Sequence, residues 1–311
     1  MKCFKKIGVT AVLSMMVATS TVNAQTIGVA IANFNDNFLT ILRNAISDKA
    51  KTMPGLKLQF EDAQTDIGRQ INQVQNFISS RVDAIIVNPA DTAATDKITA
   101  MVAEAGIPLV YVNRAPNRKD LPPKVAVVAS DHITSGRFEM EELCKQMNGK
   151  GNIVILMAEL SANHTIERTN GYKEVIKDKC PDIKILDEQA ANSQRTQAID
   201  RMTNWLSKGW QIDGVIANDD EMAVGAIQAI RSAGVPEGKI KVAGIDATPD
   251  GLAEMKKGWM HANVFQNAKG QGEGALDAAY KLIKGEKVES HIWIPYEPVT
   301  LQNYTTYMKK N

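Results

Sequence analysis

The sequence predicts an α/β protein of two domains, each with a parallel sheet covered by helices on both faces. The first observation is an alternation of short, apolar, β-rich runs with amphipathic helical stretches. The second is their number, because ten such runs exceed one ordinary doubly wound sheet and the pattern restarts after residues 125–136. The third is that polar residues cluster directly after most of the runs.

The expected strands follow one another along the chain, and helical patterns lie between them. The apolar runs of the first half lie at residues 26–31, 56–61, 83–88, 107–113 and 124–130. Those of the second half lie at residues 152–158, 183–189, 213–219, 241–247 and 261–266. Helical spacing is clearest at residues 70–82, 195–210 and 274–285. We expect the segments 261–266, 274–285 and 291–299 to cross back between the domains, and residues 115–124 to form an irregular surface loop.

The first 24 residues have the pattern of a cleaved secretory signal. Lysines precede an apolar stretch at residues 7–20, which is too short to span a bilayer, and small residues stand at positions 22 and 24. We therefore expect cleavage after Ala24 and export. Without the lysines of this segment, 36 basic residues become 33 against 35 acidic ones, and the formal charge falls from +1 to −2. That balance leaves no basic excess for binding nucleic acid.

Cysteine usage agrees with export. Cys3 lies in the expected signal, which leaves Cys144 and Cys180 in the mature chain. In an oxidising compartment such a pair can form one disulfide, and the sequence is equally compatible with two buried thiols. Each cysteine ends a helical stretch beside the expected strand 152–158, so neighbouring helices could bring the pair into bonding range. We predict the disulfide.

Polar side chains follow the ends of most expected strands. In parallel α/β sheets ligands bind beyond the carboxyl ends of the strands, because loops and helix N-termini converge there. Asp, Asn and Ser at such places are common helix caps, so each cluster alone is weak evidence. Arg114, Arg168 and Gln266 are poor caps, and their presence favours a shared polar pocket.

Other patterns do not support catalysis or metal binding. The four histidines, at positions 132, 164, 261 and 291, show no paired metal spacing, and no G-x-S-x-G nucleophile elbow is present. We interpret Asp219, Asp220 and Glu221 as an acidic first turn of a helix, where they complement the helix dipole. We expect no catalytic residue, no metal site and no cofactor.

Six motifs carry a resemblance to a known family. They are "DNF" at 36–38, "DAIIVNP" at 83–89, "IPLVYVNR" at 107–114, "ER" followed by "GY" at 167–172, "ANDDEMAVGAI" at 217–227 and "VAGIDATPDG" at 242–251. With these motifs the chain resembles the periplasmic sugar-binding proteins of ABC importers, of the ribose- and galactose-binding type. The resemblance covers essentially the whole mature length. The motifs are specific to the family but not to one sugar.

The resemblance implies two Rossmann-like lobes joined by a three-crossing hinge, with the ligand enclosed between them by hinge closure. The expected lobes are residues 25–128 with 263–288, and residues 129–262 with 289–311. It also implies a monomeric periplasmic protein that delivers its ligand to an ABC permease in the inner membrane, with a chemoreceptor as a further partner. Carried over by motif, the ligand-binding residues are Asp36, Phe38, Asn88, Asn113, Arg114, Arg168, Asn218, Asp246 and Gln266, with His164 as an additional candidate.

These residue types suit a polyhydroxylated ring. Phe38 offers an apolar face to the C–H groups of a cyclic polyol. Asp36 and Asp246 can each accept hydrogen bonds from two hydroxyls, while planar guanidinium groups match adjacent oxygens. Asparagine and glutamine donate and accept, as hydroxyls do. With two acids and two arginines the formal charge of the set is zero, which favours a neutral ligand over a sugar acid or a phosphate.

Two positions depart from the family pattern. Ser193 stands where members often carry a second aromatic that completes a sandwich around an aldose, so stacking is one-sided or comes from Phe34. His164 stands where galactose-type members carry an acid. With a closeness to inositol-binding members, these features lead us to expect a cyclitol, with myo-inositol first. A ribose- or galactose-like aldose is the alternative.

Two other classes of protein fit the sequence less well. A secreted carbohydrate-active enzyme needs a general acid, whereas we expect nearby arginines to keep Asp36 and Asp246 ionised. A transcriptional regulator of the same fold needs an N-terminal helix-turn-helix, and the signal-like segment stands in its place. The expected function is therefore binding of a neutral polyol rather than catalysis.

Overall fold

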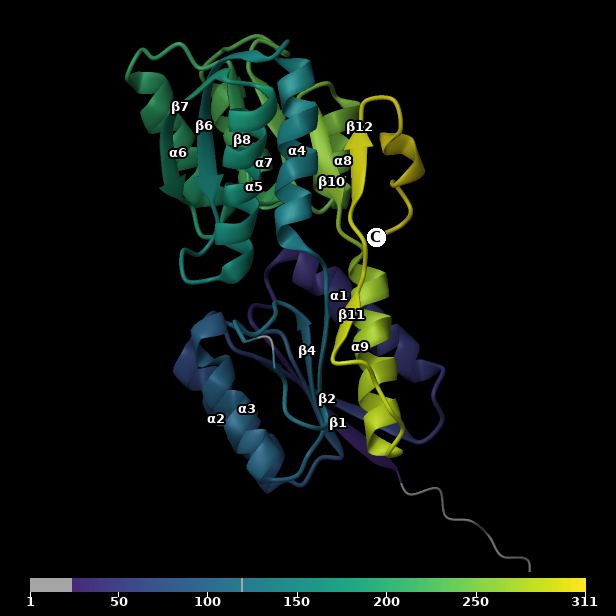
Figure 1. Ribbon diagram of the computed structural model, residues 1–311. Coiled ribbons are helices and arrows are strands. Elements are labelled where there is room, and N and C mark those ends of the chain that lie inside the picture. The colour runs from purple at the N-terminus through teal and green to yellow at the C-terminus, as the bar shows by residue number, and fades with distance from the viewer. Residues whose placement is uncertain (1–23, 119) are drawn as a thin grey trace, which may run out of the picture.

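The computed structural model describes residues 24–118 and 120–311, which form two α/β lobes joined by three chain crossings (Figure 1). The expected signal sequence up to residue 23, including Cys3, lies outside the described residues. Within the described part, none of the helices combines the length and apolarity that a bilayer crossing needs. The predicted class, two lobes of largely parallel sheet flanked by helices, is confirmed.

The first lobe holds a six-stranded parallel sheet in the order β11-β5-β4-β3-β1-β2. Its strands are β1 (Gln25–Ile31), β2 (Leu56–Asp62), β3 (Ala84–Val87), β4 (Leu109–Asn113), β5 (Val125–Ala129) and β11 (His291–Trp293). Its helices are α1 (Asn37–Lys51), α2 (Ile67–Ser79), the short 3-10 helix η1 (Thr92–Ala94), α3 (Thr95–Glu104) and α9 (Ala268–Ile283). Helices α1 and α9 cover one face of the sheet, and α2 and α3 cover the other (Figure 1).

The second lobe repeats this plan with the order β12-β10-β9-β8-β6-β7. Its strands are β6 (Lys150–Met157), β7 (Asp182–Ala190), β8 (Gly214–Ala217), β9 (Lys241–Ala243), β10 (Ala262–Phe265) and β12 (Glu297–Thr300). Its helices are α4 (His132–Gln146), α5 (Asn163–Lys179), α6 (Arg195–Ser207), α7 (Asp220–Ser232), α8 (Pro249–Lys256) and the 3-10 helix η2 (Tyr304–Thr306). All pairings are parallel except that β12 runs antiparallel to β10.

The chain crosses between the lobes after β5, after β10 and after β11. The expected lobe boundaries were wrong for two short strands. Residues 263–265, expected in the first lobe, belong to β10 of the second sheet, where Asn263 lies opposite Val299. Residues 291–293, expected in the second lobe, form β11 of the first sheet, where His291 lies opposite Val127. A pattern of apolar residues indicates a strand, but which sheet it joins depends on the backbone hydrogen bonds that it makes.

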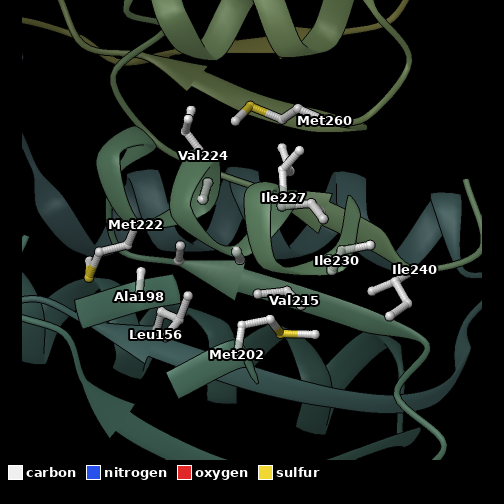
Figure 2. Close-up of a cluster of buried hydrophobic side chains, with 14 of the residues drawn as sticks. Leu156, Ala198, Met202, Val215, Met222, Val224, Ile227, Ile230, Ile240 and Met260 are labelled. Carbon is white, nitrogen blue, oxygen red and sulfur yellow. The ribbon is translucent and has the colours of Figure 1, made fainter. Parts of the chain in front are cut away.

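Buried apolar side chains fill both faces of each sheet, as parallel sheets require. Along β6, Val154 and Leu156 face the helices α6 and α7, while Ile153 and Ile155 face α4 and α5. Figure 2 shows the first of these layers, in which methionines fill the gaps between branched aliphatic side chains. These layers leave the carboxyl ends of the strands as the places where polar side chains can gather.

Polar residues at the strand ends also begin the next helices. Asp36 caps α1 by accepting a hydrogen bond from the backbone N–H of Leu39 at 2.8 Å. Asp219 caps α7 in the same way, through the N–H of Met222 at 3.0 Å. Such caps satisfy helix N–H groups that have no partner within the helix. They also fix the direction of the side chains in the first helical turn.

Helices α4 and α5 pack at close range because each contributes a glycine at the contact. A Cβ atom at Gly136 would lie 2.2 Å from the carbonyl oxygen of Arg168, and one at Gly171 would lie 2.6 Å from that of Ile133. Only glycine fits there without a shift of the backbone. The N-terminal half of α5, which carries Arg168, is therefore held firmly against α4.

Cys144 near the end of α4 and Cys180 at the end of α5 are paired as a disulfide, with their Cα atoms 6.4 Å apart. That separation lies within the usual range for a disulfide. Both residues belong to the apolar cluster between α4, α5 and the sheet. They lie at the opposite ends of the two helices from His132 and Asn163, with which the helices begin.

We expect the disulfide to stabilise the protein by about 3–4 kcal/mol, because it closes a loop with a sequence separation of 36 residues in the unfolded chain. Thiol titration of the unreduced, denatured protein beginning at Gln25 should find no free cysteine. Urea unfolding of a C144S/C180S variant should match that of the reduced wild type. Two titratable thiols before reduction would show the pairing to be absent.

Candidate functional site

A small cavity lies between the lobes, at the carboxyl ends of strands from both sheets. The space inside it that the centre of a water molecule can reach is only about 30 Å³, well below the range for small-molecule sites, so the lobes are closed tightly around it. The lobes touch around it: Asn37 Nδ2 donates to Glu221 Oε1 at 2.6 Å, and Thr92 Oγ1 donates to the carbonyl of Ser161 at 3.2 Å. The lining residues are Asp36, Phe38, Leu39, Asn113, Arg114, His132, His164, Arg168, Ser193, Asp219, Asp246 and Gln266.

The first lobe contributes an aromatic ring, an acid, an amide and a guanidinium. Phe38 is 6% exposed and belongs to the core next to α1, so its ring is held by packing. Asn113 ends β4 with a φ of 68°, and its Nδ2 donates to Gln271 Oε1 at 3.2 Å. Arg114 donates from Nη1 to the carbonyls of Pro89 and Ala90 at 3.2 and 3.3 Å. Its orientation is therefore fixed by backbone of its own lobe.

A second contact of Arg114 reaches across the cleft. Its Nη2 lies 3.6 Å from Glu159 Oε2, in the loop that follows β6 of the second lobe. The same carboxylate oxygen lies 4.0 Å from His164 Nε2 and accepts a hydrogen bond from Ser193 Oγ at 3.4 Å. Glu159 thus connects an arginine of the first lobe with two cavity residues of the second.

The second lobe contributes Arg168, which is 4% exposed. Its Nη2 donates to Gln266 Oε1 at 2.7 Å and to the hydroxyl of Tyr296 at 3.0 Å, and its Nη1 donates to the carbonyl of Asn218. The carboxylate of Asp246 lies 3.9 Å from Nη2. Four partners therefore determine the plane of this guanidinium.

Asp246 and Gln266 lie on adjacent strand ends, and a third residue holds their backbone. Asp246 has a φ of 119°, which a non-glycine residue rarely adopts. The Nδ2 of Asn311 donates to the carbonyl of Asp246 at 3.1 Å and to that of Gln266 at 2.9 Å. This bridging keeps the two side chains at a constant spacing.

Three buried donors or acceptors of the cavity have no hydrogen-bond partner within the described residues. They are Arg168 Nε, Gln266 Nε2 and His164 Nδ1. A buried polar group without a partner is unfavourable by about 1–3 kcal/mol. The cavity is therefore prepared for a molecule that supplies several hydrogen bonds at once.

Burial dominates the electrostatics of the cavity acids. It raises the pKa of Asp36 to about 6 against the opposing effects of the Leu39 N–H and Arg114. It raises the pKa of Asp219 to about 7, and it holds the pKa of Asp246 well above its usual value despite Arg168. Burial therefore outweighs the arginines at both Asp36 and Asp246, contrary to the expectation, although a pKa of about 6 leaves Asp36 mainly ionised at pH 7.

Both cavity histidines are neutral. Burial lowers the pKa of His132 well below its usual value, and Arg168 acts in the same direction. Burial followed by Arg114 and Arg168 lowers the pKa of His164 likewise. Each ring therefore carries one proton, and each presents one donor and one acceptor nitrogen.

Eight of the predicted residues line the cavity, namely Asp36, Phe38, Asn113, Arg114, His164, Arg168, Asp246 and Gln266. Asn88 and Asn218 do not line it, and both are fully buried. Asn88 Oδ1 accepts from the N–H of Ala32 at 3.2 Å, and Asn218 Oδ1 accepts from the N–H of Ala158 at 3.1 Å. The two asparagines hold equivalent strand ends, one in each lobe.

Four lining residues were not predicted as ligand-binding: Leu39, His132, Ser193 and Asp219. Asp219 caps its helix, as expected of an acidic first turn, and also faces the cavity. His132 follows the end of β5, so the strand-end rule could have found it. Phe34, proposed as a second ring, instead packs beneath Arg43 at 4.1 Å and does not line the cavity.

With Asp219 included, three acids and two arginines line the cavity, so the predicted balance of charge does not hold. Glu159 adds a further acid beside Arg114. Among the described residues no group of three or more His, Cys, Asp or Glu side chains is arranged to hold a metal ion.

Comparison with known proteins places these features in context. Residues 27–287 match the family model "Periplasmic binding protein domain". The chain is 50% identical, over 98% of both chains, to a putative rhizopine-binding protein of Rhizobium meliloti, and 30% identical to the ribose import binding protein of Bacillus subtilis, over 87% of this chain and 85% of that protein. It is similar to an ABC transporter solute-binding protein from Bacillus halodurans C-125 solved with bound myo-inositol, at 42% identity and a TM-score of 0.88, covering 94% of this chain and all of that one.

We expect the exchange of Asp219 for Asn to change how stability depends on pH. The raised pKa means that ionisation of Asp219 weakens the closed fold, so its stabilising contribution is present below pH 4 and is lost as the pH rises through about 7. D219N retains the helix cap and stays neutral. The variant should therefore gain stability relative to wild type between pH 4 and 8, by up to about 4 kcal/mol.

Urea unfolding of the ligand-free proteins at several pH values measures this difference. D66N is the matched control, because Asp66 caps α2 through the N–H of Arg69 at 2.8 Å but is exposed to water. A difference between D219N and wild type that stays constant across the pH range would contradict the assignment.

Proposed function

This chain belongs to the periplasmic binding protein domain family, and on that premise we propose that it captures a cyclic polyol, with myo-inositol as the favoured ligand. Its relatives are periplasmic substrate-binding proteins of ABC importers and not enzymes, so the chain is a sugar- or polyol-binding protein of that class. The finer proposal includes export with cleavage after Ala24 and action as a monomer. We propose a chemoreceptor, besides the permease, as a partner.

The observation that carries the proposal is a set of buried donors and acceptors that lack partners among the described residues and surround one cavity. Arg168 Nε and Gln266 Nε2 are donors that need acceptors. Asp36 and Asp246 offer carboxyl oxygens from opposite lobes. A hydroxyl both donates and accepts, so a ring with hydroxyls on many carbons can satisfy both kinds of group at once.

The apolar surface of the cavity supports a cyclitol over an aldose. Phe38 is its aromatic ring, and Ser193 occupies the place where a second platform was expected. One-sided stacking suits a ring that bears a hydroxyl on every carbon, since each edge then needs a polar partner. The similarity to a structure with bound myo-inositol supports the same choice. A ribose- or galactose-type aldose is the alternative, and the similarity to a ribose import binding protein favours it.

The excess of acids favours a second candidate, a cyclic polyol that carries one positive charge. Asp36 raises the pKa of Asp219, both of them raise the pKa of Asp246, and the two arginines do not offset all three acids. A cation among them would favour their ionised forms. Rhizopine also belongs among the ligands to test, because the relative with 50% identity carries its name.

The site is divided between the lobes, so a ligand that contacts both binds the closed form better and shifts the population toward it. Asp36, Phe38, Leu39, Asn113 and Arg114 belong to the first lobe. The remaining lining residues lie in the second lobe or at its crossings. Hinge closure is therefore the mechanism that we propose for capture.

Calorimetry on refolded, ligand-free protein tests the ligand. We expect myo-inositol to bind with micromolar or higher affinity, about −8 kcal/mol or more favourable, and ribose and galactose to bind much more weakly. The panel should include rhizopine and an amine-substituted cyclitol. Tight binding of an aldose with no heat from myo-inositol would reject the cyclitol, and tighter binding of the amine would support the charged candidate.

Replacement of Arg168 by Ala should weaken ligand binding by roughly 2–5 kcal/mol, because it removes charge-assisted hydrogen bonds and leaves buried partners unpaired. R137A is the matched control, since Arg137 lies on the neighbouring helix of the same lobe and pairs with Glu174 on the surface. R168K keeps the positive charge but lacks the planar guanidinium, so its affinity should lie between those of wild type and R168A. Normal affinity of R168A would remove Arg168 from the site.

A further inference from the structure

Tyr296 lies in the third crossing between the lobes, outside the cavity lining, and is 7% exposed. Its hydroxyl accepts a hydrogen bond from Arg168 Nη2 at 3.0 Å. The same hydroxyl lies 2.9 Å from Nδ1 of His132, the first residue of α4 beyond the first crossing. Tyr296 therefore connects two residues of the cavity without lining it.

The direction of these hydrogen bonds follows from both ends. The carbonyl of Asn113, 3.2 Å from His132 Nε2, can only accept, so Nε2 carries the proton of the neutral ring. His132 Nδ1 is then an acceptor and receives the hydroxyl proton of Tyr296. Arg168 can only donate, and the hydroxyl oxygen receives its N–H. A one-way chain thus runs from Arg168 through Tyr296 and His132 to Asn113.

This series of hydrogen bonds joins the two lobes beside the hinge. Arg168 lies on α5 of the second lobe, and Asn113 ends β4 of the first lobe. The Nη2 that reaches Tyr296 also donates to Gln266, which lies in the second crossing. Groups of the second and third crossings therefore meet at one guanidinium, and the contact between Tyr296 and His132 connects it to the first crossing. Among the described residues the Nε of this guanidinium has no hydrogen-bond partner.

We propose that Tyr296 is a positioning residue, which sets the Arg168 guanidinium for the ligand when the lobes close and couples it to Asn113 across the hinge. This inference rests on the proposed function, because it concerns the binding of the same polyol. On this proposal, opening the lobes breaks or misaligns the hydrogen bond between His132 and Asn113, so that the series of hydrogen bonds is complete only in the closed form. The Tyr296 hydroxyl thus favours closure of the lobes around a bound ligand and slows the release of that ligand.

Exchange of Tyr296 for Phe keeps the ring and removes the hydroxyl. Y307F is the matched control, because Tyr307 is also 7% exposed and its hydroxyl donates to Glu297 Oε2 at 3.0 Å, away from the cavity. Melting temperatures of the ligand-free proteins report the structural cost of each exchange. Calorimetry and stopped-flow dissociation with myo-inositol, or with the tightest ligand of the panel, report binding.

We expect Y296F to bind about 10-fold more weakly or worse, mainly through faster dissociation, while its melting temperature stays close to that of Y307F. A cycle with H132A provides a second measurement: the two exchanges should be less than additive in affinity, because they interrupt one chain. Equal affinities for Y296F and Y307F, or strict additivity with H132A, would overturn the inference alone. Absence of binding by the wild type to every polyol of the panel would reject the proposed function, and the inference with it.

Discussion

A buried guanidinium governs the arrangement between the lobes. Arg168 is placed by the close contact of α4 and α5, which Gly136 permits, and its donors reach Gln266 and Tyr296 at two of the crossings. A charge removed from water in this way must be surrounded by acceptors. The carbonyls, amides and carboxyl groups of the site are gathered around it for that reason, and Nε is the one guanidinium nitrogen without a hydrogen-bond partner among the described residues.

The geometry of parallel sheets made much of the site predictable. Strand ends converge at one edge, so Arg114 and Gln266 could be placed in a shared pocket from their positions after apolar runs. The same reasoning could not tell a side chain that faces the cavity from one that turns into its own lobe, as Asn88 and Asn218 do. Nor could it assign β10 and β11 to a sheet, because short strands acquire their place from the backbone beside which they lie.

Electrostatics proved the least predictable feature. The formal charges of the predicted site residues balance, with two acids against two arginines. Burial, however, raises the pKa of Asp36 to about 6 and that of Asp219 to about 7. Desolvation depends on how tightly the lobes enclose a group, which a linear pattern does not contain. The dual role of Asp219, as helix cap and as cavity wall, is hidden for the same reason. The protonation state of these acids thus depends on how closely the lobes enclose them and not on the amino-acid composition.

Asn88 and Asn218 secure equivalent strand ends through the same hydrogen bond, in which the amide oxygen accepts from the backbone N–H that follows the neighbouring strand. The main-chain frame of each half of the site therefore stands independently of the side chains that project from it. A substitution at Phe38 alters the aromatic surface in the first half of the site and leaves the backbone around Asp246 in the second half unchanged. Preference for a new cargo can consequently evolve one half at a time, with no need to rebuild the hinge.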